Sequence, residues 1–203
     1  MISSGYSAEA WGLKPEAYVG DVDWGEPYRA NLTGWILAAA PGSVLDVGCL
    51  DGRLIRRLRG LGYGGSYLGI DITPAFIDVA RLRSPGEAFE VGDARSLRSG
   101  LRSDVVVLAN VIMHLDDPWA AMREACAAAT QRVLVSTYAH YGKVDVEEPG
   151  AGFLNHWFAR GEVLAHVPRG WRFVRESLFR PTWAQEEWKR VMQVELKPTE
   201  SRP

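Results

Sequence analysis

The sequence has little cysteine and histidine, and it lacks any long hydrophobic run. Its two cysteines, Cys49 and Cys126, and its four histidines do not fall at the spacings of zinc ligands. No apolar stretch is long enough to cross a bilayer or to serve as a signal peptide. These absences argue against a disulfide framework, a structural metal and a membrane segment, and they indicate a reduced, cytoplasmic protein.

An excess of charge of one sign is also missing. The 23 basic and 25 acidic side chains leave a formal net charge of -2. A chain so close to neutral has no general attraction to nucleic acid or to anionic membranes, so we expect neither as a partner. The densest basic run, RLIRRLR at 53–59, has helical spacing, and we expect it to form a solvated helix face.

What the sequence does contain is an alternation of strand and helix signals. Hydrophobic residues make up 47% and charged residues 24% of the 203 positions, which is typical of one soluble globular domain. Thr73–Pro74 and Asp117–Pro118 each place a capping residue before a first-turn proline, and so mark two helix starts. Apolar runs rich in β-branched residues mark five buried strands, at 43–48, 66–71, 88–93, 104–110 and 132–137. The alternation predicts a parallel, open α/β sheet with right-handed crossovers.

The last third of the chain has a different pattern. The segments 170–179 and 187–196 are expected to be adjacent antiparallel strands that close one edge of the sheet. Before them, the glycine-rich segment 138–157 is too long for a bare connector, and loops of this size are commonly lids or binding elements.

The N-terminal 40 residues are rich in Trp and Tyr and end in an expected helix at 27–40. We therefore divide a single domain into an N-terminal cap (1–40), a cofactor-binding core (41–137) and a substrate loop with a C-terminal hairpin (138–203).

Polar residues and glycines gather at the carboxyl ends of the expected strands, outside which open α/β sheets bind their ligands. Glycines after the first strand let a ligand approach the backbone, and an acid ending the second strand can accept two hydrogen bonds from a ribose diol. An acid after the third strand stands where an adenine amino group would be read. In chain order the residues are Asp46, Gly48, Gly52, Asp71, Asp93 and Asn110. Together they predict a pocket for an adenosine.

At these residues the sequence resembles the class I S-adenosylmethionine-dependent methyltransferases, over roughly residues 40–197. VLDVGCLDG (44–52) is similar to the family's first motif, and LGIDIT (68–73) is similar to its second. VGDARSL (91–97) is similar to the third, and LANVIMHLDDP (108–118) resembles the segment after the fourth strand. The resemblance implies a Rossmann-like, seven-stranded, mostly parallel sheet with an antiparallel edge strand and helices on both faces.

The resemblance also implies a reaction and a cofactor. Such enzymes transfer a methyl group from S-adenosylmethionine and release S-adenosylhomocysteine. Asn110 stands where catechol-type relatives hold magnesium with an acid, so no metal is expected, and the Asn/Asp-Pro-Pro-aromatic motif of nucleobase methylation is missing. Residues 155–174 are similar to tellurite-resistance and quinone-biosynthesis members, which favours a small-molecule acceptor with an oxygen or nitrogen nucleophile.

Site residues follow from the same resemblance. It assigns the cofactor to the loop after the first strand and to later strand ends, at Asp46, Gly48, Cys49, Leu50, Gly52, Asp71, Ile72, Asp93, Ala94 and Asn110. Candidates for acceptor binding are the aromatic and histidine residues Tyr28, His114, Tyr138, Tyr141 and His156. His114 is also the candidate general base, because histidine titrates near neutrality. A packed thiol, and not a nucleophile, is expected at Cys49.

Leu50 departs from the family, which commonly has glycine at this position. Because a positive φ is costly for leucine, one expectation is an ordinary backbone with the side chain packed over the following helix. The other is a reshaped cofactor pocket, which includes a catalytically degenerate fold that binds a nucleoside or a partner.

A rival from another enzyme class is an NAD-dependent reductase, but it needs G-x-G-x-x-G where residues 48–52 read GCLDG. Monomer and homodimer both remain open.

Overall fold

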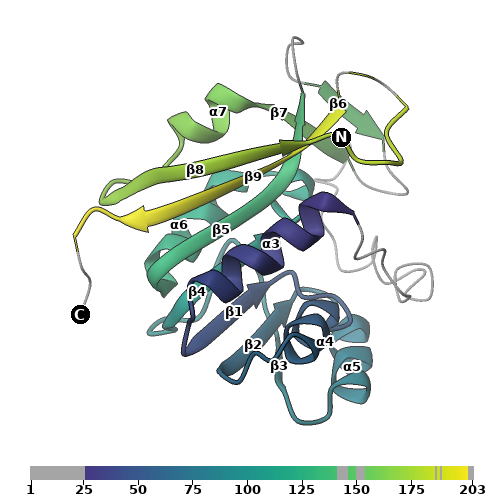
Figure 1. The fold of residues 1–203 in the computed structure, drawn as a ribbon, viewed down its shortest axis with the longest axis vertical. Helices are drawn as coiled ribbons and strands as arrows, with labels where there is room; N and C mark the ends of the chain where they lie inside the picture. Colours follow the sequence, from purple (N-terminus) through teal and green to yellow (C-terminus); the bar gives the residue numbers. More distant parts are fainter. Residues whose placement is uncertain (1–25, 141–145, 150–153, 186, 188, 201–203) are drawn as a thin grey trace.

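A twisted, mostly parallel sheet forms the centre of the molecule, with helices on both of its faces (Figure 1). The structure is a computed structural model that describes residues 26–140, 146–149, 154–185, 187 and 189–200. Along the sheet the strands follow the order β3-β2-β1-β4-β5-β7-β6, while β9 pairs with β5 and β8 pairs with β9.

The strands are β1 (Ser43–Val47), β2 (Ser66–Asp71), β3 (Ala88–Val91), β4 (Ser103–Ala109), β5 (Ala129–His140), β6 (Val146–Pro149), β7 (Leu154–Ala159), β8 (Trp171–Phe179) and β9 (Lys189–Pro198). The helices are α3 (Pro27–Ala38), α4 (Arg53–Gly60), α5 (Pro74–Arg83), the short 3-10 helix η1 (Ile112–His114), α6 (Pro118–Ala128) and α7 (Arg160–Ala165).

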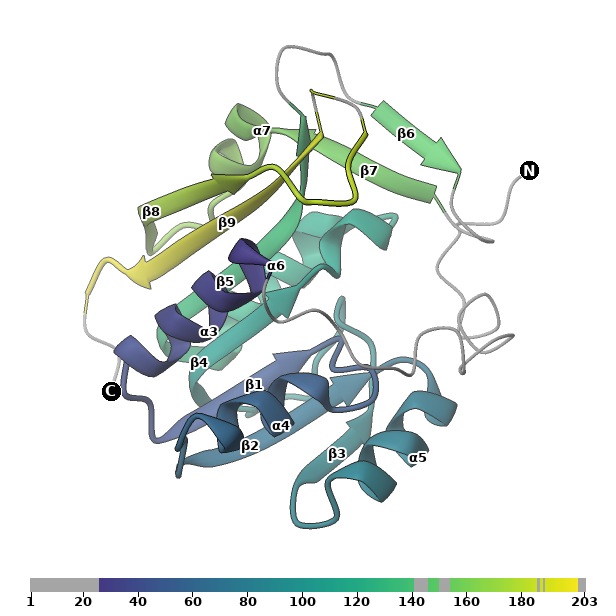
Figure 2. The ribbon, with the colours of Figure 1, turned by 45° about the vertical axis from the view of Figure 1, so that its right-hand side comes forward.

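The core consists of two apolar clusters, one on each face of the sheet. Alternate residues of β4 point to opposite faces, so that Val105 and Val107 join one cluster while Val106 and Leu108 join the other. The first cluster includes apolar residues of α3, α4 and α5, and the second includes those of α6. Figure 2 shows α3 and α4 on one side of the sheet and α6 on the other. Strands β1, β4 and β5 are therefore buried on both faces, as their apolar runs predict, whereas β3 at the edge keeps Ala88 and Val91 exposed.

The expected sheet is present, with one difference, which is two additional strands beyond the end of β5. The segment expected to be a loop contributes two further strands, β6 and β7, and β7 pairs in parallel with the end of β5 at Ala139 and Phe158. As expected, β8 and β9 form an antiparallel pair that closes one edge of the sheet, and β9 pairs antiparallel with β5. The difference arises because β5 continues to His140, beyond the part of the strand that pairs with β4, and β7 pairs with this extension.

The two proline-marked helix starts are observed, but their caps differ. Asp117 Oδ1 accepts a hydrogen bond from the Ala120 amide (2.9 Å) and caps α6 as expected. The Thr73 side chain makes no capping bond to α5, which corrects the sequence prediction. Instead the Thr73 amide donates to Asp71 Oδ1 (2.9 Å), so the end of β2 is joined directly to the start of α5.

Helix α3 is anchored to the C-terminal strand by a buried amide. Gln193 on β9 is fully buried, and its Nε2 donates to the Tyr28 carbonyl oxygen (2.6 Å). Its Oε1 accepts from Asn31 Nδ2 (2.7 Å). Both polar atoms of Gln193 are thus used to place the first turns of α3 against β9.

Within the described ranges, no helix combines the length and the apolar character needed to cross a membrane.

Asp104 ties together the amino-terminal ends of three strands. Its Oδ2 accepts from the amides of Gly42 (2.7 Å) and Ser43 (3.2 Å), which precede and begin β1. Its Oδ1 accepts from Thr130 Oγ1 (3.1 Å) on β5. One carboxylate on β4 therefore fixes its two neighbours in register.

We predict that Asp104→Ala lowers the free energy of unfolding by about 2 kcal/mol, because the two amides lose a charged acceptor. Urea denaturation measures the change. The matched control is Asp78→Ala, since Asp78 is exposed and forms only a surface ion pair with Arg81 (3.6 Å), and we expect a change below about 0.5 kcal/mol. Equal stabilities of the Asp104 variant and the wild type would contradict this role.

Candidate functional site

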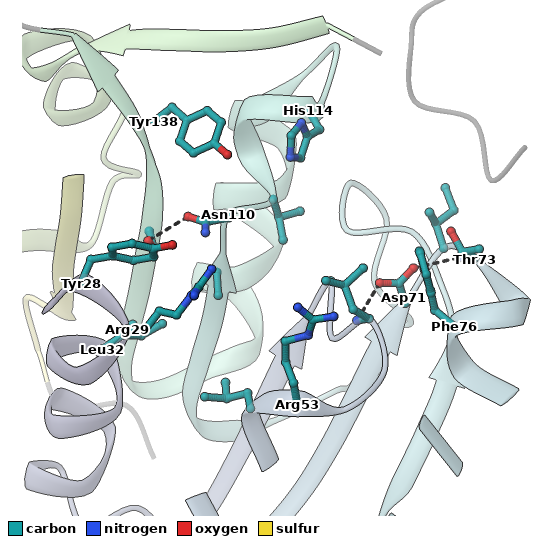
Figure 3. Close-up of a pocket in the computed structure, with 17 residues that line it drawn as sticks. Tyr28, Arg29, Leu32, Arg53, Asp71, Thr73, Phe76, Asn110, His114 and Tyr138 are labelled. Atoms are coloured by element: carbon teal, nitrogen blue, oxygen red, sulfur yellow. Dashed lines mark hydrogen bonds between the residues drawn. The ribbon is translucent and has the colours of Figure 1, made fainter. Parts of the chain in front are cut away.

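A cavity of about 270 Å³ opens at the carboxyl ends of the central strands (Figure 3). It is lined by α3, by the loop between β1 and α4, by the connection from β2 to α5, and by the ends of β4 and β5. The lining residues are Tyr28, Arg29, Leu32, Gly48, Leu50, Arg53, Leu54, Asp71, Ile72, Thr73, Phe76, Ala109, Asn110, Val111, His114, Ser136 and Tyr138. Figure 3 shows Asp71, Thr73 and Phe76 at one end, with Tyr28, Asn110 and Tyr138 at the other.

Asp71 ends β2 and is the one acid among the described lining residues. Its Oδ2 accepts from the Leu50 amide (3.0 Å) and its Oδ1 from the Thr73 amide (2.9 Å). Burial raises the pKa of this carboxyl, and the hydrogen bonds from Thr73 and Leu50 oppose that rise. A carboxylate oxygen can accept two hydrogen bonds, and these two amides supply one to each oxygen of Asp71. The position fits the ribose acid that the sequence predicts.

The glycine loop after β1 uses its own amides within the protein. Gly48 and Cys49 both donate to the Ile70 carbonyl oxygen (2.7 and 3.0 Å), and Gly52 donates to the Cys49 carbonyl oxygen (3.0 Å). Gly48 has a φ of +81°, and a Cβ added there would overlap the Val111 side chain. With the Leu50 amide held by Asp71, four loop amides are occupied, whereas a phosphate-binding loop presents its amides to the ligand.

Leu50 has a φ of +50°, so the expectation of an ordinary backbone at this residue is wrong. The left-handed conformation costs a leucine about 1–2 kcal/mol. The surrounding loop imposes it, because the Leu50 amide is fixed on Asp71. The side chain is half-buried and lines the cavity.

Several residues assigned to the cofactor lie behind the cavity wall and do not line it. Asp46 is buried, and its Oδ2 accepts from the Tyr67 hydroxyl (2.8 Å). Burial raises the pKa of Asp46 to about 7, against the effect of the Tyr67 bond. Cys49 is buried too, and burial raises the pKa of its thiol well above the usual value, as suits a packed thiol. Gly52 packs against the Phe89 ring.

Asp93 and Ala94, assigned to the adenine, also lie outside the lining. Asp93 Oδ2 accepts from Arg95 Nη2 (2.7 Å), and its Oδ1 accepts from the Arg95 amide (2.8 Å). The Arg95 side chain lowers the pKa of Asp93, so this acid is ionised and paired at neutral pH. Ala94 is buried in an apolar cluster of the core.

The acceptor candidates divide into three groups. Tyr28, His114 and Tyr138 line the cavity, and the rings of His114 and Tyr138 meet edge to face with centroids 6.4 Å apart. His156 lies outside the lining and packs against Phe158, with ring centroids 6.0 Å apart. Tyr141 lies outside the described residues.

The far end of the cavity is fixed by β4 and β5. Asn110 lines it with a φ of +57°, and its Oδ1 accepts from Ser136 Oγ (3.0 Å). Burial raises the pKa of the Tyr138 hydroxyl to about 12, so this group keeps its proton at neutral pH. Tyr138 can therefore donate a hydrogen bond but does not act as a base.

The sequence interpretation missed two arginines, Arg29 and Arg53, that line the cavity. Arg53 Nε is 2.8 Å from Asp51 Oδ1, and Asp51 is fully buried. Arg56 and Arg83 also pair with Asp51, at 2.9 and 2.8 Å.

This cluster corrects the expectation that RLIRRLR forms only a solvated helix face. Burial acts to raise the pKa of Asp51, but Arg53 and Arg56 outweigh it, and the pKa is lowered. The sequence signal for this ion-pair cluster was an acid, Asp51, shortly before a basic helix. The position of Arg29 depends on how α3 docks.

Within the parts of the chain that the structure describes, no group of three or more His, Cys, Asp or Glu is placed to hold a metal ion.

The raised pKa of Asp46 predicts a pH-dependent stability. Between pH 4 and pH 7 the unfolded chain releases this proton while the folded protein keeps it, since the pKa rises from 3.8 to about 7 on folding. The wild type should therefore lose stability relative to Asp46→Asn as the pH rises through this range. Thermal unfolding of both proteins at a series of pH values measures the difference. A difference that stays constant from pH 4 to pH 8 would contradict the prediction.

Comparisons with known proteins agree with this geometry. Residues 45–134 match a family model described as a methyltransferase domain. A curated relative, trans-aconitate 2-methyltransferase from Methylobacterium nodulans, is 34% identical over 84 residues. That match covers 41% of this chain and 32% of the relative, so the chain matches about a third of the relative's length.

Solved structures resemble the whole described architecture at low identity. The 1,6-didemethyltoxoflavin-N1-methyltransferase of Burkholderia thailandensis, with its substrate and S-adenosylhomocysteine bound, has a TM-score of 0.74 at 16% identity, covering 95% of this chain and 87% of that one. Magnesium protoporphyrin IX methyltransferase from Synechocystis PCC 6803, with bound S-adenosylhomocysteine, has a TM-score of 0.70 at 16% identity, covering 95% and 98%. The chain thus has the fold of these two methyltransferases, and its residues 45–134 are similar to the methyltransferase domain family.

Proposed function

We propose that this protein transfers a methyl group from S-adenosylmethionine to a small-molecule acceptor with an oxygen or nitrogen nucleophile. The observation that carries the proposal is the Asp71 carboxylate, which faces the cavity beside a glycine loop whose amides are occupied. A ribose needs such a carboxylate, while a phosphate needs free amides. The site is therefore suited to a nucleoside that carries no phosphate.

This reasoning also separates the proposal from an NAD-dependent reductase. A dinucleotide places its pyrophosphate on bare amides at the start of the helix after β1. Here Gly48, Cys49, Leu50 and Gly52 donate to acceptors of the protein itself. The occupation of these four amides supports the methyltransferase proposal.

The residues around Asp71 suit the parts of S-adenosylmethionine. Ile72 and Phe76 offer apolar surface for the adenine next to the ribose acid. Arg29 and Arg53 bring positive charge to the cavity, which suits the carboxylate of the amino acid part. Asp46, Cys49 and Gly52 would act from behind the wall by holding the loop in shape. Asp93 and Ala94 would contact the adenine only if the bound ligand extended beyond the residues that line the cavity.

When bound, the cofactor supplies a methyl group on a positively charged sulfur. Methyl transfer is an in-line displacement, so the protein has to align the acceptor and exclude water. Tyr28 and Tyr138 would hold the acceptor, with the Tyr138 hydroxyl as a hydrogen-bond donor. His114 would accept a proton where the nucleophile must lose one. A nucleophile that is already deprotonated would need no base.

The helix α3 supports the proposed role of residues 1–40 as a cap within a single domain, because it contributes Tyr28, Arg29 and Leu32 to the cavity. The described relatives act on trans-aconitate, 1,6-didemethyltoxoflavin and magnesium protoporphyrin IX, which supports a small acceptor without selecting one. Cys49 and Cys126 are buried and are not joined in a disulfide, as suits the proposed cytoplasmic location. A monomer and a homodimer both remain compatible with the site.

Calorimetric titration with S-adenosylhomocysteine, with NAD in parallel, tests the proposed pocket. We expect the wild type to bind S-adenosylhomocysteine and not NAD. Asp71→Asn should weaken that binding about 10- to 100-fold, because the ribose loses a charged acceptor. Asp93→Asn, outside the cavity lining, is the matched comparison and tests whether this acid reads the adenine. Binding of NAD alone, or unchanged affinity of Asp71→Asn, would refute the assignment.

Replacement of His114 tests the proposed base. With an acceptor whose nucleophile carries a proton, His114→Gln should lower kcat by about 10²-fold or more and flatten the pH dependence of kcat. Affinity for S-adenosylhomocysteine should stay the same. Release of S-adenosylhomocysteine with a panel of hydroxyl and amine acceptors measures turnover. An unchanged pH profile of the variant would show that His114 only packs at the mouth.

A further inference from the structure

Leu50 combines a strained backbone with a side chain that the core does not use. Its φ of +50° is one that glycine adopts freely and leucine does not. Its side chain belongs to neither of the two apolar clusters, although it is half-buried. It lines the cavity instead. A strained residue in such a position is a candidate for a role in ligand binding.

The hydrogen bond to Asp71 places Leu50 beside the proposed ribose site. The Leu50 amide nitrogen is 3.0 Å from Asp71 Oδ2. An N–Cα bond is about 1.46 Å long, so the Leu50 Cα lies within about 4.5 Å of that oxygen. A ribose hydroxyl bonded to Asp71 would therefore be within reach of the leucine side chain.

We propose that the Leu50 side chain binds the nucleoside by packing against the ribose and the adjoining thioether chain, as an apolar wall of the cavity. The inference rests on the proposed function and gives the Leu50 side chain a specific role at a position where the family commonly has glycine. A glycine would relieve the backbone but would leave this wall open. The leucine destabilises the free protein and stabilises the complex, because ligand binding buries the apolar surface that is still exposed on this half-buried side chain.

Three variants separate the side chain from the backbone strain. Leu50→Gly removes both, Leu50→Ala removes the wall and keeps a residue with a Cβ at positive φ, and Ala40→Gly relieves strain elsewhere. Ala40 has a φ of +46°, is exposed at the end of α3, and does not line the cavity. It is therefore the matched control for the backbone effect.

The experiment is calorimetric titration with S-adenosylhomocysteine, together with thermal unfolding of the free proteins. Leu50→Gly should bind about tenfold more weakly and unfold about 3 °C higher. Leu50→Ala should also bind several-fold more weakly, without the higher Tm. Ala40→Gly should unfold about 3 °C higher and bind as the wild type does.

Binding of Leu50→Gly as tight as that of the wild type, or tighter, would overturn the proposal. An equal loss of affinity in Ala40→Gly would overturn it too, because relief of backbone strain, and not removal of the wall, would then explain the loss. Failure of the wild type to bind S-adenosylhomocysteine would instead refute the proposed function itself, so the two failures are distinguishable.

Discussion

The buried carboxylate of Asp71 joins three parts of the site that are distant in the sequence. It ends β2, accepts the Leu50 amide from the loop after β1, and accepts the Thr73 amide at the start of α5. A carboxylate in this position needs donors, because an unsatisfied buried charge is strongly destabilising. The same two bonds that satisfy the charge also fix the loop and the helix around the cavity. Asp71 therefore provides both the proposed ligand-binding group and the structural support of the site.

The occupied amides of the glycine loop give this fold its particular chemistry. Open α/β sheets bind many ligands at the same edge, so the fold alone does not name the ligand. Here Gly48 and Cys49 donate back to the Ile70 carbonyl oxygen of β2. The loop therefore closes on the neighbouring strand and leaves the carboxylate of Asp71 as the acidic group in the described lining.

Much of the fold and the acidic end of the site could be predicted from the sequence. The apolar runs identify strands because such runs are buried on both faces of a parallel sheet. Asp71 could be placed at the ligand edge because it directly follows one of these runs. The prediction that the basic helix forms only a solvated face was wrong, because the fully buried Asp51 forms ion pairs with Arg53, Arg56 and Arg83.

Other features depend on tertiary contacts that the sequence does not display. The backbone of Leu50 is set by its bond to Asp71, and local preference alone would have avoided that conformation. The position of Arg29 in the cavity depends on the docking of α3. Strands β6 and β7 form where β5 extends beyond its apolar run, so no hydrophobic pattern marked the place where β7 pairs.

The anchoring of α3 has a consequence for how the protein is made. Tyr28 and its neighbours on α3 form one wall of the cavity, yet Gln193 on β9 holds the first turns of that helix. During synthesis the N-terminal helix leaves the ribosome long before β9 does. The cavity is thus completed only when β9 has emerged and paired with β5, and a nascent chain that already contains the whole glycine loop still lacks a finished binding site.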